Sequence, residues 1–192
     1  MEAHGTATPP WDLGRPQPAL AALAEAGGFD GRVLDVGCGS GENALMIAAL
    51  GLETVGLDID SSAVDDARRK AHERRLDHRA AFLRFDIRRL DELGEVFDTV
   101  LDSLVFHAFD DRARQNHADG LRTVLRPGGR LHVLCYSDRH TAPPNVPHAV
   151  SLTDIDTVFR DGWSVDDVTA TTSASTLHPD GVAAWLIACT RR

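Results

Sequence analysis

The stretch over residues 33–41, VLDVGCGSG, constrains the fold of this chain more than any other part of its sequence. Its apolar start is typical of a central strand in a parallel sheet, because such strands are buried on both faces. Three glycines then alternate through a turn that is too tight for side chains. Residues 42–50 (ENALMIAAL) have helical composition and end at Gly51. The stretch therefore predicts the first strand, turn and helix of a doubly wound α/β sheet.

Two acidic residues narrow the choice of cofactor. A second strand is predicted over residues 53–57, and Asp58 follows it roughly 20 residues after the glycines. Dinucleotide-binding folds have an acidic residue at this distance, which binds the ribose hydroxyls. A pyrophosphate-binding turn reads G-x-G-x-x-G, whereas this turn reads G-x-G-x-G and has Asp35 two residues before its first glycine. A carboxylate there would repel a pyrophosphate and suit a cofactor that carries an ammonium or a sulfonium.

At these residues the sequence resembles the class I S-adenosylmethionine-dependent methyltransferases, whose first motif is an acid followed by G-x-G-x-G. The resemblance implies a single Rossmann-like domain over residues 1–192, with strand order 3-2-1-4-5-7-6 and the last strand antiparallel. It implies S-adenosyl-L-methionine as the cofactor. The residues that the resemblance places against this cofactor are Asp35, Gly37, Cys38, Gly39 and Gly41 at the methionine part, Asp58 and Ile59 at the ribose, and Asp86 and Ile87, after a third strand over 81–85, at the adenine.

Composition excludes several other classes. A chain of 192 residues is long enough for one well-packed domain and short for two. The net charge of −9 and the lack of a strong basic cluster argue against a nucleic-acid substrate. No apolar run approaches the about 20 residues that cross a bilayer, and residues 1–12 do not read as a signal peptide. We therefore expect a cytoplasmic protein, monomer or homodimer, with no membrane partner and, since its three cysteines lack C-x-x-C spacing, no metal.

A tryptophan marks the start of the chain. Residues 1–18 are expected to form a flexible segment and a candidate lid over the active site. Trp11 is costly to expose, so its ring either lies against cofactor or substrate or plugs the outside of the sheet. The pattern P-W-D-x-G-x-P resembles the thiopurine, thiol and halide methyltransferases and bacterial enzymes that N-methylate heterocyclic toxins. In that group the segment folds over the active site, which makes Trp11 a cofactor or substrate contact.

Polar residues follow the fourth predicted strand, residues 97–101. Asp102, Ser103 and His107 come at its carboxyl end, where doubly wound sheets bind ligands. Asp102 is predicted to contact the cofactor and to orient the substrate beside it, and Ser103 to donate a hydrogen bond. His107 is predicted to accept a proton from an N–H or S–H nucleophile, with a purely structural histidine as the alternative.

Several further elements are predicted along the chain. A helix over 63–75 is capped by the string Asp60-Ser61-Ser62, with Asp65 placed as in a capping box with Ser62, and its basic side chains are expected on a solvated face. A helix over 110–124 ends at an L-R-P-G-G turn, and a strand follows over 130–136. Residues 137–148 form a loop that could cover the substrate. Thr153 caps a short helix that ends at Arg160, and the last two strands cover 164–172 and 182–190.

The resemblance implies methyl transfer to a small molecule, with an aromatic N-heterocycle or a thiol as the favoured acceptor. A phenolic or quinol oxygen and a halide stay open as acceptors. One rival from another enzyme class is a nicotinamide-dependent oxidoreductase, which the G-x-G-x-G spacing disfavours. A rival without catalysis is a protein that binds S-adenosylmethionine and transfers nothing.

Overall fold

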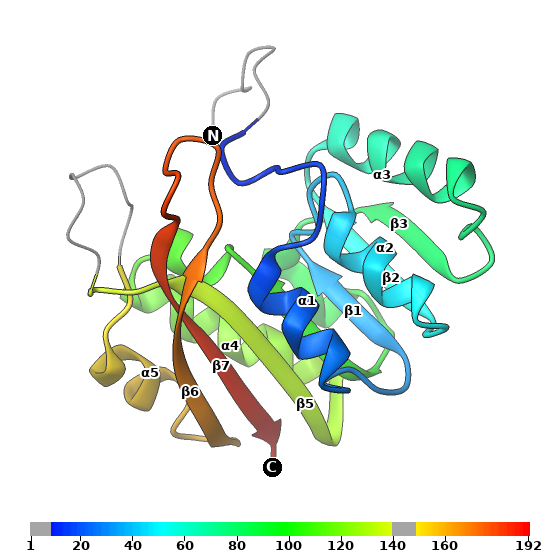
Figure 1. The fold of residues 1–192 in the computed structure, drawn as a ribbon. Coiled ribbons are helices and arrows are strands. Elements are labelled where there is room, and N and C mark those ends of the chain that lie inside the picture. Colours follow the sequence, from blue (N-terminus) through cyan, green and yellow to red (C-terminus); the bar gives the residue numbers. More distant parts are fainter. Residues whose placement is uncertain (1–8, 140–148) are drawn as a thin grey trace.

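Seven strands form one sheet in the order β3-β2-β1-β4-β5-β7-β6 (Figure 1). The computed structural model describes residues 9–139 and 149–192, so the predictions for residues 1–8 and 140–148 lie outside the described residues. Neighbouring strands are parallel from β3 to β5, and β7 runs antiparallel to both β5 and β6. The predicted strand order and the antiparallel last strand are confirmed. The strands are β1 (Val33–Val36), β2 (Thr54–Asp58), β3 (Ala80–Arg84), β4 (Phe97–Ser103), β5 (Leu125–Tyr136), β6 (Trp163–Ser173) and β7 (Val182–Arg191).

Helices cover both faces of the sheet, with α1 and α2 on one face and α4 on the other (Figure 1). Leu20 of α1 and Ile47 of α2 pack on one side of β1, while Leu121 of α4 belongs to the large cluster on the other side. This double cover explains why the four residues of β1 are all buried, as the apolar run predicted. The helices are α1 (Pro18–Glu25), α2 (Glu42–Ala49), α3 (Ser61–Glu73), α4 (Asp111–Val124) and α5 (Leu152–Val158), with short 3-10 turns η1 (Ile87–Glu92) and η2 (Phe106–Ala108).

The helix caps agree with the prediction in one case and differ in the other. Within the predicted string 60–62, Asp60 caps α3, because its carboxylate accepts the Ser62 amide at 2.8 Å; this cap replaces the predicted capping box of Ser62 with Asp65. Ser151, not Thr153, caps α5 in a reciprocal capping box with Asp154, and this helix ends at Val158. The cap of α5 therefore lies two positions earlier than predicted.

The L-R-P-G-G turn also differs from its prediction. It lies inside β5, which begins at Leu125 instead of residue 130. Phe97 pairs with Leu125 and Thr99 pairs with Arg130, so the intervening residues form an irregularity in the ladder between β4 and β5. The turn therefore interrupts the pairing of a strand that has already started.

The carboxyl ends of the parallel strands define the edge of the sheet where a ligand is expected. The connection between β6 and β7 lies at the same edge, since β6 runs in the direction of β5. The N-terminal segment runs beside this connection (Figure 1), and the Thr176 amide donates to the Pro10 carbonyl at 2.9 Å. Within the described part of the chain, no helix has the length and apolar character needed to span a membrane.

Candidate active site

The glycine turn after β1 is closed on one side and open on the other. Gly37 has a φ of +69°, and a Cβ built on it would lie 2.3 Å from Cγ2 of Val105, so a larger residue would clash. Gly39 also has a positive φ, but a Cβ there would meet nothing within 4 Å. The backbone at Gly39 can therefore be approached closely by a ligand, whereas Gly37 packs against the loop after β4.

Asp35 is a fully buried carboxylate at the end of β1. Neither of its oxygens has a hydrogen-bond partner within the described chain. Burial, together with the nearby charges of Asp102 and Asp58, raises its pKa to about 8, although the Ala44 amide acts in the opposite direction. A cationic ligand would relieve this cost, so Asp35 fits the ammonium and sulfonium charges of S-adenosylmethionine.

Asp58 connects the end of β2 to the glycine turn. Its Oδ2 accepts the Gly39 amide at 2.8 Å, and its Oδ1 accepts the Asp60 amide at 2.9 Å. Ile59, the next residue, exposes much of its side chain at this edge. Asp58 is therefore placed at the open part of the turn, where a ribose hydroxyl could reach a carboxylate.

Asp86 lies at the corresponding position after β3. Its carboxylate pairs with the Arg88 guanidinium at 2.6 Å and also accepts the Arg88 amide. The hydrogen bonds from Arg88 lower the pKa of Asp86 to about 2. An adenine amino group would share this carboxylate with Arg88, while Ile87 packs partly against the core beside it.

Cys38 occupies the turn but directs its side chain away from the open face. The thiol is buried in the cluster formed with α2 and α3. Burial and the nearby Asp35 and Asp58 raise its pKa well above the ordinary range, so the thiol is a small packing group and not a nucleophile. The Cys38 amide donates to the Leu57 carbonyl, which fixes the turn against β2.

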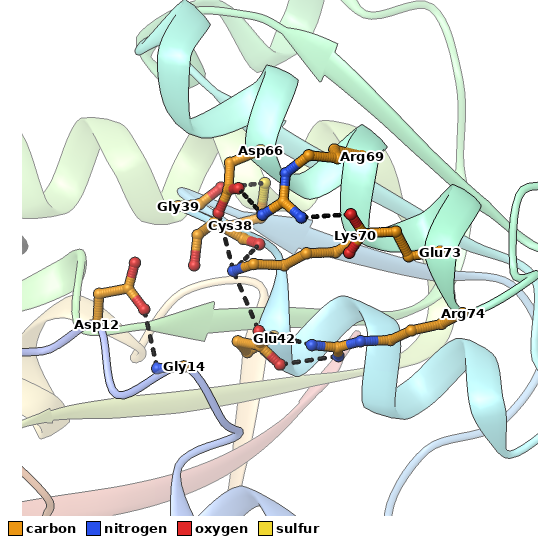
Figure 2. Close-up of polar contacts among 11 residues, drawn as sticks. Asp12, Gly14, Cys38, Gly39, Glu42, Asp66, Arg69, Lys70, Glu73 and Arg74 are labelled. Atoms are coloured by element: carbon orange, nitrogen blue, oxygen red, sulfur yellow. Dashed lines mark hydrogen bonds and ion pairs between the residues drawn. The ribbon is translucent and has the colours of Figure 1, made fainter.

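An ion network fastens α3 to the glycine turn (Figure 2). The Lys70 ammonium donates to the Ser40 carbonyl at 3.1 Å and lies 3.0 Å from both Glu42 and Asp66. Glu42 also accepts two hydrogen bonds of 2.9 Å from Arg74. The solvated-face prediction is wrong for Lys70, whose side chain is only 13% exposed. This network supports the start of α2 at the point where the turn ends.

Asp102 is engaged on both of its oxygens. Oδ1 accepts the amides of Val105 and Phe106, at 3.2 and 3.0 Å, and Oδ2 lies 2.7 Å from Nε2 of His117. The carboxylate is fully buried. In this arrangement Asp102 organises the loop after β4, and because its carboxylate is fully buried, the predicted direct contact with substrate or cofactor would require a neighbouring group to move. Ser103, at the end of the strand, is half-buried.

His107 lies in η2 and stacks on Tyr136 of β5, with ring centroids 4.1 Å apart. Burial is the largest cause that lowers its pKa to about 4, with Arg114 acting in the same direction and Asp102 against it. The ring is therefore neutral near pH 7, where it can exchange hydrogen bonds but is a weak base. The site thus has two adjacent ring systems at the ends of β4 and β5.

The N-terminal segment is held at this edge by Gln17. Its buried side chain accepts the Ala174 amide at 2.9 Å and donates to the Ala174 carbonyl at 3.1 Å. The backbone amide of Gln17 also donates to the side-chain oxygen of Asn43 in α2. Trp11, ahead of it, is 49% exposed. Residues 9–17 therefore have a defined place between α2 and the β6–β7 connection.

Sequence reasoning missed several residues of the site. His117 and Arg114 lie on the buried face of α4, where each side chain is only 2% exposed. Their spacing from Ala118 and Leu121 follows the periodicity of the apolar stripe, which was the available signal. Tyr136 and Gln17 carried no motif of their own.

Comparison with known proteins assigns the family. The family described as methyltransferase domain matches residues 33–129, about half of the chain. The 2-heptyl-1-hydroxyquinolin-4(1H)-one methyltransferase of Mycobacteroides abscessus is 35% identical over 164 residues, which cover 84% of this chain and 71% of that protein. The probable thiol methyltransferase 2 of Arabidopsis thaliana is 34% identical over 152 residues, which cover 78% of this chain and 66% of that protein.

One solved structure supports the same assignment. The structure is described under conversion of a disulfide bond into a thioacetal group during echinomycin biosynthesis. Its sequence is 35% identical to this chain, and the two structures superpose with a TM-score of 0.86. The alignment covers 95% of this chain and 84% of that one. Together these matches decide between the two cofactor classes that the glycine turn left open. The chain belongs to the class I S-adenosylmethionine-dependent methyltransferases, with S-adenosyl-L-methionine as its methyl donor.

Proposed function

We propose that this enzyme methylates a small aromatic acceptor, a nitrogen heterocycle or a thiol, at the carboxyl edge beside His107 and Tyr136. The observation that carries the proposal is the stacked pair of these two rings at the carboxyl ends of β4 and β5. An aromatic face beside such a pair can gain further ring contacts. The two relatives named above support this acceptor class, since one is named for a quinolone and the other for thiols.

When bound, S-adenosylmethionine would supply a methyl group on positively charged sulfur; the acceptor's lone pair would bond to the methyl carbon in line as the carbon–sulfur bond breaks and a neutral thioether leaves. We assign Asp35, the turn backbone, Asp58 and Asp86 to holding the donor, with Ile59 and Ile87 beside them. The residues at β4 and β5 then align the acceptor. Alignment and exclusion of water supply most of the rate, because charge is dispersed and not created in this step.

The acid–base role of His107 is limited in this proposal. A ring with a pKa of about 4 is a poor match for a thiol, whose ordinary pKa is about 8.5. We therefore assign His107 to orienting the acceptor by stacking and hydrogen bonding, with Ser103 as a further donor. The acceptor reacts as a thiolate or as an unprotonated ring nitrogen.

Oxygen acceptors form a second candidate class. The Mycobacteroides relative is named for a 1-hydroxyquinolone, in which a hydroxyl is attached to the ring nitrogen. An aromatic hydroxyl would fit the same ring pair, so the position that receives the methyl group must be determined on the product.

A panel of acceptors tests the proposal. The purified chain is incubated with S-adenosylmethionine and either 2-heptyl-1-hydroxyquinolin-4(1H)-one, thiophenol, a simple phenol or iodide, and the products are analysed by mass spectrometry. The proposal expects methylated quinolone or thiophenol at the highest kcat/KM. Methylation of iodide alone would contradict it. Binding of S-adenosylhomocysteine without transfer to any acceptor would instead support a non-catalytic binding protein.

A further inference from the structure

A hydrogen-bonded path leads from α4 to the two sides of the active site. It starts at His117, whose side chain is 2% exposed and whose Nε2 lies 2.7 Å from Oδ2 of Asp102. The other oxygen of Asp102 accepts the amides of Val105 and Phe106. Those two residues begin the turn that carries His107. One buried carboxylate therefore connects a helix on the far face of the sheet to the loop after β4.

The loop that Asp102 holds is conformationally strained. Leu104, between Ser103 and Val105, has a φ of +65°, which a residue with a Cβ rarely adopts. The Leu104 amide donates to the Leu134 carbonyl at 2.8 Å, so the strained residue is also tied to β5. Such a conformation persists when surrounding contacts determine it, and the amides after it are fixed by Asp102.

Both ends of this loop face the site. Val105 fills the space that a Cβ on Gly37 would occupy, so it sets how close the loop lies to the glycine turn. His107 stacks on Tyr136, so the loop also sets the position of the ring pair. A shift of the Val105 and Phe106 amides would move both contacts together.

We propose that His117 is a positioning residue for methyl transfer, which acts through Asp102 on the Val105–Phe106 amides and so places His107 relative to the glycine turn. His117 touches neither donor nor acceptor in this role. Its hydrogen bond holds the Asp102 carboxylate in the orientation that receives both amides. Without it, the buried carboxylate is free to turn, and the strained loop can relax.

Two amide variants of His117 separate this role from general packing. In His117→Gln the side-chain NH₂ can reach the position of Nε2 and donate to Asp102, whereas in His117→Asn it falls short. The variants share their chemistry and differ in reach. Leu121→Ala, on the same buried face of α4, is the control for loss of packing without loss of the hydrogen bond.

The first measurement needs no acceptor. Hydrogen exchange of the Val105 and Phe106 amides should be faster in His117→Asn and near the wild-type rate in His117→Gln. Leu121→Ala should not speed these two amides more than it speeds the rest of the core. Equal exchange in both amide variants would overturn the proposal, and this arm holds even if the proposed acceptor class is wrong.

The second measurement rests on the proposed function and uses thiophenol or 2-heptyl-1-hydroxyquinolin-4(1H)-one, whichever the wild-type enzyme methylates. His117→Asn should lower kcat/KM for that acceptor on the order of 10- to 100-fold, with S-adenosylhomocysteine affinity within about twofold of wild type. His117→Gln should recover most of the rate. An equal loss of kcat/KM in His117→Asn and His117→Gln, or a parallel loss of cofactor affinity, would assign His117 a structural role only.

Discussion

At the scale of single residues, the site is built from carboxylates that have different partners. Asp58, Asp86 and Asp102 accept hydrogen bonds from backbone amides, whereas Asp35 has no partner on either oxygen within the described chain. An unpaired buried carboxylate is costly to the fold and useful to a cationic ligand. The ligand-free enzyme should therefore be destabilised by the same residue that attracts the donor.

Replacing Asp35 with asparagine tests this cost. The pKa of Asp35 is raised to about 8, so the folded protein keeps a proton that the unfolded chain releases from about pH 4 upward. The stability contributed by this proton is present at low pH and is lost as the pH rises through 8. At pH 8 the free energy of unfolding of ligand-free Asp35→Asn should therefore exceed that of wild type by on the order of 2–4 kcal/mol. Near pH 4 the two proteins should differ little in this free energy.

Urea unfolding at the two pH values measures this difference, and calorimetry measures the affinity of the variant for S-adenosylhomocysteine. The affinity should fall, because the neutral amide cannot pair with the ligand's ammonium. A stability gain of equal size at both pH values would show that the Asp35 charge is not its source.

At the scale of elements, Gln17 is the buried anchor of the N-terminal segment. The Gln17 side chain makes two hydrogen bonds to Ala174, and its backbone amide makes a third to Asn43 of α2. Gln17→Ala would leave the Ala174 amide and carbonyl without these partners and should lower the free energy of unfolding by about 1–3 kcal/mol. Proteolysis within the β6–β7 connection should become faster, and acceptor KM should rise if the segment is a lid.

Arg15→Ala is the matched control, since Arg15 is an exposed neighbour in the same segment. It should leave stability and proteolysis near the wild-type values. Equal effects of the two variants would show that the buried Gln17 contacts do not hold the segment in place. Truncation experiments should likewise end before Gln17, so that loss of the lid is not confused with loss of this anchor.

The elements also show where reasoning from sequence succeeds. The strands around the glycine turn were predictable because their apolar runs are local and continuous. The true extent of β5 was not, because it depends on the pairing of Phe97 with Leu125 across the sheet. His117 and Gln17 were missed for the same reason, since their partners are 15 and 157 residues away in the chain.

At the scale of the whole molecule, the fold brings three strand ends, the loop after β4 and the N-terminal segment to one edge of the sheet (Figure 1). Two helices behind that edge contact the site directly. Lys70 of α3 donates to the Ser40 carbonyl of the glycine turn, and His117 of α4 is hydrogen-bonded to Asp102. The donor and acceptor sides of the site therefore each have an anchor on a covering helix.

Calorimetric titration with S-adenosylhomocysteine, for wild type and Asp58→Ala, tests the central claim most directly, because it needs no acceptor. Asp58 accepts the Gly39 amide and is assigned to the ribose hydroxyls. Wild type should bind saturably with one site, and Asp58→Ala should bind more weakly by about 1–3 kcal/mol while remaining folded. Unchanged affinity in the variant, or no binding by the folded wild-type chain, would contradict a donor site at the glycine turn.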